Sequence, residues 1–146
     1  MSVKEIDLVL KNEPGQLSLV SDILGSNGIN IIAFYVYTTG DKGCLKFVAN
    51  DPEKAITVLR SRGYKINTDE VIACETPNHP GGLNSILKPL KKAEINVGYI
   101  YPCLSSQGTG GTAILILGIE SQDIERTLSV LKENWIRVLN AELYRL

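Results

Sequence analysis

The chain alternates between segments in which apolar residues recur at every second position and segments in which they recur at every third or fourth. The first spacing indicates half-buried strands, and the second indicates helices with one buried face. Residues 1–68 predict strand, helix, strand, strand, helix and strand, over 6–10, 17–28, 29–38, 44–49, 51–63 and 64–66. Residues 69–146 repeat that order, over 71–75, 83–93, 95–101, 113–119, 121–131 and 138–144.

This order predicts an α+β fold of two ferredoxin-like βαββαβ units. In each unit an antiparallel four-stranded sheet would carry both helices on one face. We place the domains at 1–68 and 69–146. A unit of about 70 residues buries only a modest core, so we expect the halves to pack together or to dimerise.

The two halves also share a local sequence pattern. Residues 12–31 (NEPGQLSLVSDILGSNGINI) match residues 78–97 (NHPGGLNSILKPLKKAEINV) at seven of twenty positions without a gap, at a constant offset of 66 in the numbering. The later helices align at an offset of 72, so the second copy is slightly longer, and we expect its extra residues in its hairpin. Polar residues kept in both copies are the first candidates for a site.

Several local expectations follow from residue type. Asp51 and Pro52 predict the start of a helix, as N-cap and first helical residue, and Ser121 can cap the corresponding helix of the second copy. Pro89 lies inside a predicted helix, where an interior proline costs about 3 kcal/mol, so we expect a kink or weakening there. The segment 107–112 (QGTGGT) lacks the GK[ST] of a phosphate loop and is expected to be a hairpin tip.

Composition and charge exclude several classes of protein. Apolar residues make up 44% of the chain and charged residues 21%, which is typical of a soluble globular protein. The net charge of −1 leaves no basic field that would attract nucleic acid or anionic membranes. No apolar run approaches the length of a membrane span and the N-terminus is charged, so we expect a cytoplasmic protein. Cys44, Cys74 and Cys103 are expected to be buried thiols, since neither they nor the single histidine show metal-ligand spacing.

The turn before the first helix of each copy is the best candidate for a ligand site. It reads Asn-Glu-Pro-Gly at 12–15 and Asn-His-Pro-Gly at 78–81. Its backbone N–H groups open at a helix N-terminus, which favours a carboxylate, and glycine lets a ligand approach the backbone. The asparagine amide offers a donor and an acceptor, as a zwitterionic amino acid requires. Alternatively, Pro-Gly makes the bend and each asparagine satisfies the backbone of the turn.

The pattern N-x-P-G-x-L, an amphipathic helix, then G-I-N-I and a hairpin resembles the ACT domain, the small-molecule sensing module of amino-acid metabolism. It is similar above all to the serine-sensing domain of phosphoglycerate dehydrogenase and to the regulatory domains of aspartokinases. The resemblance covers nearly the whole chain as two tandem copies. It implies that an amino acid binds between paired domains, held by this turn and by the start of the second strand.

Carried over, the ligand-binding residues are Asn12, Gly15, Gln16, Leu17 and Asn30 in the first copy, and Asn78, Gly81, Gly82, Leu83 and Asn96 in the second. His79 is added because it lies in the second turn and can donate to a carboxylate, although an exposed turn residue is the simpler interpretation. The serine-sensing pattern has a histidine two residues before the turn asparagine. Leu10 and Thr76 occupy those positions here, which argues against serine.

RNA-recognition domains share the βαββαβ order and have to be weighed. Their central strand begins Lys-Gly and then presents aromatic side chains that stack on bases. Here Lys42 and Gly43 are followed by Cys44 and Lys46 at the aromatic positions, and the second copy has aliphatic residues there. The stacking platform is missing, so RNA binding is disfavoured.

We therefore expect a non-enzymatic, allosteric regulatory protein, without a cofactor or metal, that senses a free amino acid or a related small carboxylate at an interface between ACT domains. Its expected partners are a second copy of the chain and a metabolic enzyme. The alternative is a regulatory subunit or oligomerisation module without a ligand of its own. An enzyme is the third possibility, but no residues nominate the chemistry. Trp135 and Tyr144 are expected to be core or interface anchors.

Overall fold

The computed structural model describes residues 3–104 and 111–146 of the chain. They divide into two compact units, one of Lys4–Asp69 and one that includes Glu70–Leu146. Each unit has its own sheet, its own pair of helices and its own hydrophobic core. Within the described residues no helix is long and apolar enough to cross a membrane.

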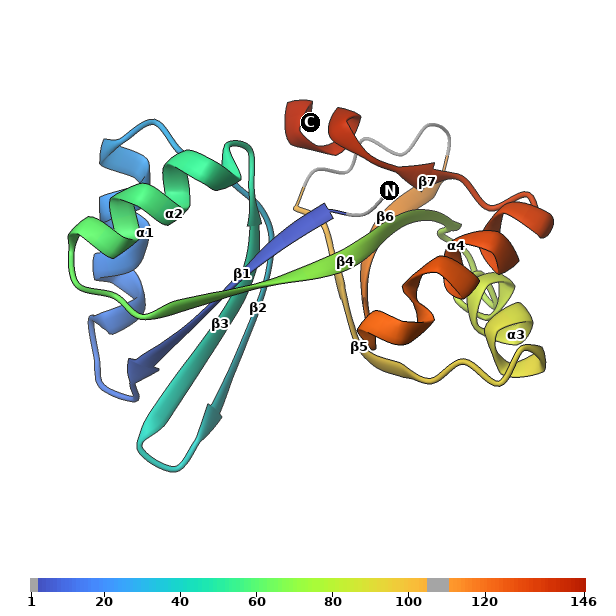
Figure 1. Cartoon of the computed structure of the whole chain (residues 1–146), viewed down its shortest axis with the longest axis horizontal. Coiled ribbons are helices and arrows are strands. Elements are labelled where there is room, and N and C mark those ends of the chain that lie inside the picture. Colours follow the sequence, from blue (N-terminus) through green and yellow to red (C-terminus); the bar gives the residue numbers. More distant parts are fainter. Residues whose placement is uncertain (1–2, 105–110) are drawn as a thin grey trace. The chain divides into compact units, whose positions relative to one another are not determined.

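The first unit follows the predicted order of elements (Figure 1). They are β1 (Val3–Lys11), α1 (Gln16–Ser26), β2 (Ile31–Thr39), β3 (Lys42–Ala49), α2 (Pro52–Ser61) and the beginning of β4 (Ile66–Pro77). β3 pairs antiparallel with β1 on one side and with β2 on the other, and β1 lies next to β4 in the strand order. Both helices lie on the same face of this sheet.

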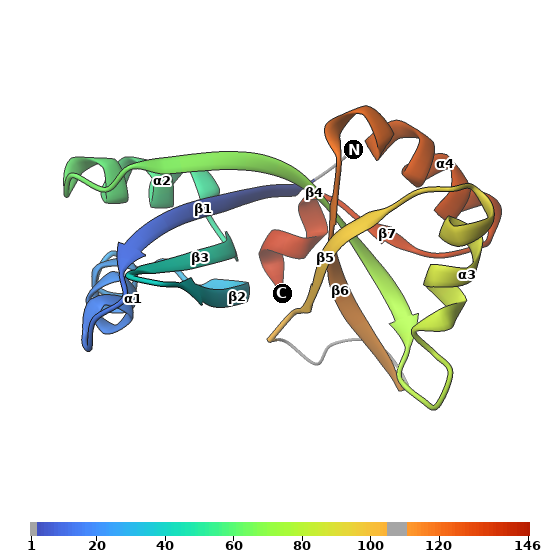
Figure 2. The ribbon, with the colours of Figure 1, turned by 90° about the horizontal axis from the view of Figure 1, so that it is seen from below.

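The second unit repeats the arrangement (Figure 2). After the rest of β4 come α3 (Asn84–Lys92), β5 (Val97–Pro102), β6 (Thr112–Ile119), a 3₁₀ helix (Ser121–Asp123), α4 (Ile124–Glu133), β7 (Val138–Leu139) and a last 3₁₀ helix (Ala141–Arg145). β6 pairs antiparallel with β4 and with β5, and β7 pairs with β4. The predicted α+β fold of two ferredoxin-like units is confirmed.

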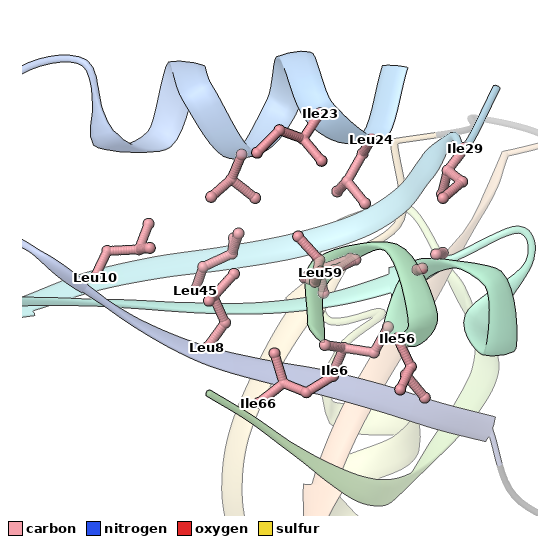
Figure 3. Packing of buried hydrophobic residues seen from close by; sticks show 14 residues of the cluster. Ile6, Leu8, Leu10, Ile23, Leu24, Ile29, Leu45, Ile56, Leu59 and Ile66 are labelled. Atoms are coloured by element: carbon pink, nitrogen blue, oxygen red, sulfur yellow. The ribbon is translucent and has the colours of Figure 1, made fainter. Parts of the chain in front are cut away.

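The core of the first unit lies between its sheet and its helices. Alternate residues of β1 and β3 point toward the helices, and α1 contributes one buried stripe because its apolar residues recur at helical spacing. Figure 3 shows Ile23 and Leu24 of α1 directed toward Leu8 and Leu45 of the sheet. All four side chains are buried.

The two sheets agree in register, not only in order. Ile6 pairs with Phe47 in the first unit. In the second unit the equivalent residues, Ile72 (66 positions after Ile6) and Leu117 (70 positions after Phe47), are also paired. The same β-bulge interrupts the β2–β3 pairing just after Ile31 and the β5–β6 pairing just after Val97. Since a register slip of one residue would turn every side chain to the opposite face, this agreement means that equivalent residues face the same way in both units.

The extra residues of the second copy lie in two places. The offset between equivalent residues rises from 66 in β5 to 70 in β6, which puts most of them in the β5–β6 connection. It rises again to 72 at α4, and the 3₁₀ helix Ser121–Asp123 accounts for that difference. The expectation that all of them belong to the hairpin is therefore wrong. The predicted hairpin tip at 107–112 falls largely on residues outside the described part of the chain.

The strand predictions near the ends of the two units need correction. The strand expected at 71–75 and the last residue of the strand expected at 64–66 belong to one continuous strand, β4, because no glycine or proline interrupts the chain between them, and residues 64–65 lie outside it. The strand expected over 138–144 ends at Leu139. Asn140 leaves the extended conformation, with φ −119° and ψ −119°, and the following 3₁₀ helix buries Leu143 completely.

The helix starts differ between the copies. Asp51 caps α2 as predicted, accepting a 3.2 Å hydrogen bond from the backbone N–H of Lys54. Ser121 does not play this role, because it opens the 3₁₀ helix and α4 begins only at Ile124. α3 continues through Pro89 to Lys92 but is shorter than α1, nine residues against eleven.

Two expectations about burial are corrected as well. Trp135 is 93% exposed, so it is no core residue, and its role as an interface anchor stays a prediction. Of the three cysteines, which are all free thiols, only Cys74 is buried, and Cys44 and Cys103 are half-buried. Both results follow from position: Trp135 lies in the turn after α4, whereas Cys74 lies on the core face of β4.

Candidate functional site

The first β1–α1 turn is open to solvent and built around a left-handed glycine. Gly15 has φ +88°, and a Cβ added there would have no heavy atom within 4 Å among the described residues. The backbone N–H of Asn12 donates to the Asp41 carbonyl at 2.8 Å, and its side-chain Nδ2 donates to the Gly40 carbonyl at 3.1 Å. The Asn12 amide donor thus fastens the turn to the tip of the β2–β3 hairpin.

The second turn keeps part of this geometry. Gly81 has φ +81° and is equally open, and the backbone N–H of Asn78 donates to the Gly111 carbonyl at 2.7 Å, as Asn12 does in the first copy. His79 is exposed, and its Nδ1 lies 2.9 Å from the Pro80 carbonyl, a contact that requires the proton on Nδ1. The imidazole is therefore engaged with its own turn.

Gly82 differs from its counterpart Gln16 in being closed off. It is buried, and an added Cβ would lie 2.0 Å from the carbonyl oxygen of Pro77. Its own carbonyl accepts a 3.0 Å hydrogen bond from the hydroxyl of Thr76. Glycine at this position is required by the packing of the turn against the end of β4, whereas Gly15 and Gly81 leave room for a ligand.

The asparagines at the start of the second strand lie away from the turns of their own units. Asn30 follows α1, and an eleven-residue helix is about 16 Å long, so Asn30 and Asn12 stand at opposite ends of α1. Figure 3 shows the same separation between Leu10, at the turn end, and Ile29. Each unit by itself therefore brings together only the turn residues, namely Asn12, Gly15, Gln16 and Leu17 in the first copy and Asn78, Gly81, Gly82 and Leu83 in the second.

Both asparagines are exposed. The backbone N–H of Asn30 donates to Oδ1 of Asn50 at 2.9 Å, and its carbonyl accepts from the backbone N–H of Asn50 at 3.0 Å. Asn50 is not among the residues predicted from the sequence, and its equivalent in the second copy, 70 positions later, is Glu120. Asn96 lines a shallow, open hollow of about 470 Å³ at the C-terminal end of α3, together with Lys91 and Glu94.

A small cavity lies between α1 and the first sheet, and we call it the α1–β2 cavity. Its volume is about 200 Å³, and it is lined by Leu17, Val20, Ser21, Ile31, Phe34, Val36 and Leu45. Only Leu17 among these was a predicted site residue. Leu17 and Phe34 are large apolar residues that remain 44% and 43% exposed, and neither exposure could be read from the sequence.

Glu75, Cys74 and Cys103 of the second unit have shifted pKa values. Glu75 on β4 accepts hydrogen bonds from the Thr112 hydroxyl at 2.5 Å and from Arg137 at 3.1 Å. Both bonds lower the pKa of the Glu75 carboxyl, and the bond from Thr112 has the larger effect. Burial raises the pKa of Cys74 to about 12 and that of Cys103 to about 11. Residues 3–104 and 111–146 contain no group of three or more His, Cys, Asp or Glu residues arranged to hold a metal ion.

Comparison with solved structures identifies relatives of the whole fold. The chain is 28% identical to protein BT0572 from Bacteroides thetaiotaomicron, with a TM-score of 0.89 over 100% of this chain and 98% of that one. It matches the regulatory subunits of aspartate kinase from Thermus thermophilus and Thermus flavus with TM-scores of 0.66 and 0.63, at 14% and 15% identity, over 92% of this chain and 94% of each of those chains. No protein of curated function matches the sequence.

The family assignment rests on the sequence as well as on the fold. The family model described as an ACT domain pair matches residues 1–145, which is nearly the whole chain. The repeated turns and the matching registers of the two sheets are what such a pair requires. The chain belongs to the family of ACT domain pairs.

Proposed function

We propose that this protein is a non-enzymatic regulatory protein that binds a free amino acid or a related small carboxylate. The observation that carries the proposal is the repeated β1–α1 turn, in which the left-handed glycines Gly15 and Gly81 leave the backbone open at the start of a helix. The N-terminus of a helix stabilises a carboxylate, and an open glycine allows the close approach that backbone recognition needs. Membership of a family of paired ACT domains supports a sensing role.

The binding site would combine residues of two units. Within one unit, Asn30 lies at the far end of α1 from Gly15, so a ligand of amino-acid size cannot contact both. A turn from one unit and the start of the second strand from another, in the same chain or in a second copy, would hold the ligand between them. This requirement supports a homodimer or a pairing within the chain. The proposed location, where free amino acids and metabolic enzymes meet, is the cytoplasm.

Regulation would follow from unequal affinity of the ligand for two arrangements of the units. The arrangement that binds the amino acid more tightly becomes more populated, and a metabolic enzyme that recognises one arrangement gains or loses its partner. The regulatory subunits of aspartate kinase, which share the fold, are a precedent for this kind of role.

Isothermal titration of the full chain with each of the twenty amino acids tests the proposal. We expect at least one to bind with a millimolar or lower Kd, and we expect Asn30→Ala or Asn96→Ala to weaken that binding at least tenfold. Asn134→Ala is a suitable control, because Asn134 is an exposed asparagine at the end of α4 that belongs neither to a turn nor to the start of a second strand. If no amino acid binds up to millimolar concentration, sensing is refuted. If one binds but both variants bind it like the wild type, the two asparagines have no part in the site.

One observation favours the alternative of an interaction module without a ligand. The Nδ2 donor of Asn12 is used by the hairpin tip, so this shared part of the repeat also has a purely structural use. A pull-down from cell extract separates the two functions. Recovery of the same enzyme with and without added amino acids supports the interaction module, whereas recovery that depends on one amino acid supports sensing.

A further inference from the structure

We propose that the α1–β2 cavity of the first unit receives the apolar side chain of the bound amino acid, so that the protein selects a ligand such as leucine or phenylalanine over polar and charged amino acids. This inference rests on the proposed function and specifies its ligand.

The chemistry of the cavity wall supports an apolar occupant. Val20 and Leu45 are buried, whereas Leu17 and Phe34 are 44% and 43% exposed and so border the solvent-accessible part of the cavity. An apolar group that enters would leave water and cover these two side chains. A charged group would lose its hydration without gaining a counter-charge, because the hydroxyl of Ser21 is the polar side-chain group in the lining.

The size of the cavity indicates that it takes only part of a ligand. Its volume of about 200 Å³ lies below the roughly 300–1,000 Å³ that is typical of pockets for whole small molecules. A branched or aromatic side chain is of the right order, and a nucleotide or a large cofactor is excluded. The charged main-chain groups of the amino acid would then remain outside the cavity.

The position of the cavity connects it to the open turn. Leu17 lies in the first turn of α1, two residues after the left-handed Gly15, and also lines the cavity. Because α1 rises only about 1.5 Å per residue, the start of the cavity and the turn lie within a few ångströms of each other. An amino acid with its carboxylate at the turn can therefore direct its side chain into the cavity.

The second unit provides a natural contrast at the equivalent positions. Leu87 stands where the first unit has Ser21, and Pro102 stands where it has Val36, both at the offset of 66 that relates the two copies. Leu87 is half-buried and lines the hollow beside Asn96, and it puts a leucine side chain on α3 where α1 has the short side chain of Ser21. The first unit is thus the one that accepts an apolar side chain here.

The test is isothermal titration of the full chain with leucine, phenylalanine, serine, aspartate and lysine. We expect leucine or phenylalanine to bind at least tenfold more tightly than the three polar amino acids. Ser21→Leu, which copies the second unit, should raise the Kd at least tenfold, because its side chain fills the cavity. Ser26→Leu is the matched control, because it adds the same side chain at an exposed position of α1 that does not line the cavity, and its Kd should stay within threefold of the wild type. Ser21 is exposed on a helix, and unchanged thermal melting would confirm that Ser21→Leu is folded.

Failure of this inference differs from failure of the proposed function. If a polar amino acid binds as tightly, or if Ser21→Leu leaves the Kd unchanged, selection by the cavity is refuted while sensing stands. If no amino acid binds, the protein is titrated with isovalerate, a carboxylate that carries an apolar chain without the amino group, and its binding is followed by NMR. Shifts of the Leu17, Val20 and Val36 methyl NMR signals in the wild type but not in Ser21→Leu would support the apolar cavity and refute amino-acid sensing. Unchanged signals would refute both.

Discussion

The hydroxyl of Thr76 donates a 3.0 Å hydrogen bond to the carbonyl of Gly82 and thereby holds the turn between β4 and α3 against the end of β4. Thr76 is only 5% exposed, and Gly82 is also buried. The equivalent positions in the first unit are Leu10 and Gln16, which cannot reproduce a hydroxyl bond to a tightly packed glycine. The two candidate turns are therefore built differently, although their sequence motif is the same.

Gly82→Ala should destabilise the second unit. The added Cβ would lie 2.0 Å from the Pro77 carbonyl oxygen, so the strand end or the turn has to move. Overpacking of this kind costs about 1–3 kcal/mol of unfolding free energy, which urea denaturation followed by circular dichroism would measure. Gly25→Ala is the matched control, because Gly25 lies in α1 with nothing within 4 Å of the new Cβ among the described residues, and there alanine should stabilise by up to about 1 kcal/mol. Equal effects of the two substitutions would contradict the packing argument.

Glu75→Gln should make the protein less stable at neutral pH and less sensitive to acid. The Thr112 hydroxyl and then Arg137 lower the pKa of the Glu75 carboxyl in the folded state, below the roughly 4.3 of an unfolded glutamate. The stabilisation is therefore complete above pH ~4.3 and is lost as the pH falls through the folded-state pKa.

The expected loss for Glu75→Gln at pH 7 is about 1–2 kcal/mol, since the carboxylate side chain is only 13% exposed. Denaturation curves of the wild type and the variant should converge toward pH 3. Glu133→Gln, at an exposed position at the end of α4, should change stability by less than about 0.5 kcal/mol. A constant difference between wild type and Glu75→Gln at every pH would show that charge is not the cause.

Asp51→Ala and Ser121→Ala should differ, although both residues precede a helix in equivalent parts of the repeat. Asp51 caps α2 through the backbone N–H of Lys54, and loss of such a cap costs about 1 kcal/mol. Ser121 lies in a 3₁₀ helix before α4, so its loss should cost less than about 0.5 kcal/mol. Thermal unfolding of both variants tests this, and a larger effect at Ser121 would contradict the described helix start.

Trp135→Gly should stabilise the protein. Trp135 has φ +60° after α4, and the equivalent residue after α2 is Gly63 with φ +85°. A left-handed conformation costs a non-glycine residue about 1–2 kcal/mol, part of which the greater freedom of glycine in the unfolded chain offsets. The net gain expected is up to about 1 kcal/mol, measured by circular dichroism, and Gly63→Ala should lose a similar amount. A destabilised Trp135→Gly would mean that the indole, although 93% exposed, makes contacts that matter.

The order of strands and helices could be predicted because it depends on local spacing. Ile6, Leu8 and Leu10 alternate in one strand, and the apolar stripe of α1 recurs at helical intervals, so the sequence of each element indicates the face that it buries. The ends of elements were less certain. Nothing in the residues near Leu139 shows that the strand stops and that Leu143 is buried by a 3₁₀ helix, since that outcome depends on packing against distant residues.

The duplication, the fold class and the two turns can be derived from the order of residues alone, because glycines in left-handed turns and apolar periodicity are properties of neighbouring residues. Packing in three dimensions closes Gly82 while it leaves Gly15 and Gly81 open, and it places Asn30 a helix length away from Gly15. It also makes Leu17 and Phe34 border one cavity. Room, distance and burial arise between residues far apart in the chain, so two copies of one motif differ in structure wherever those neighbours differ.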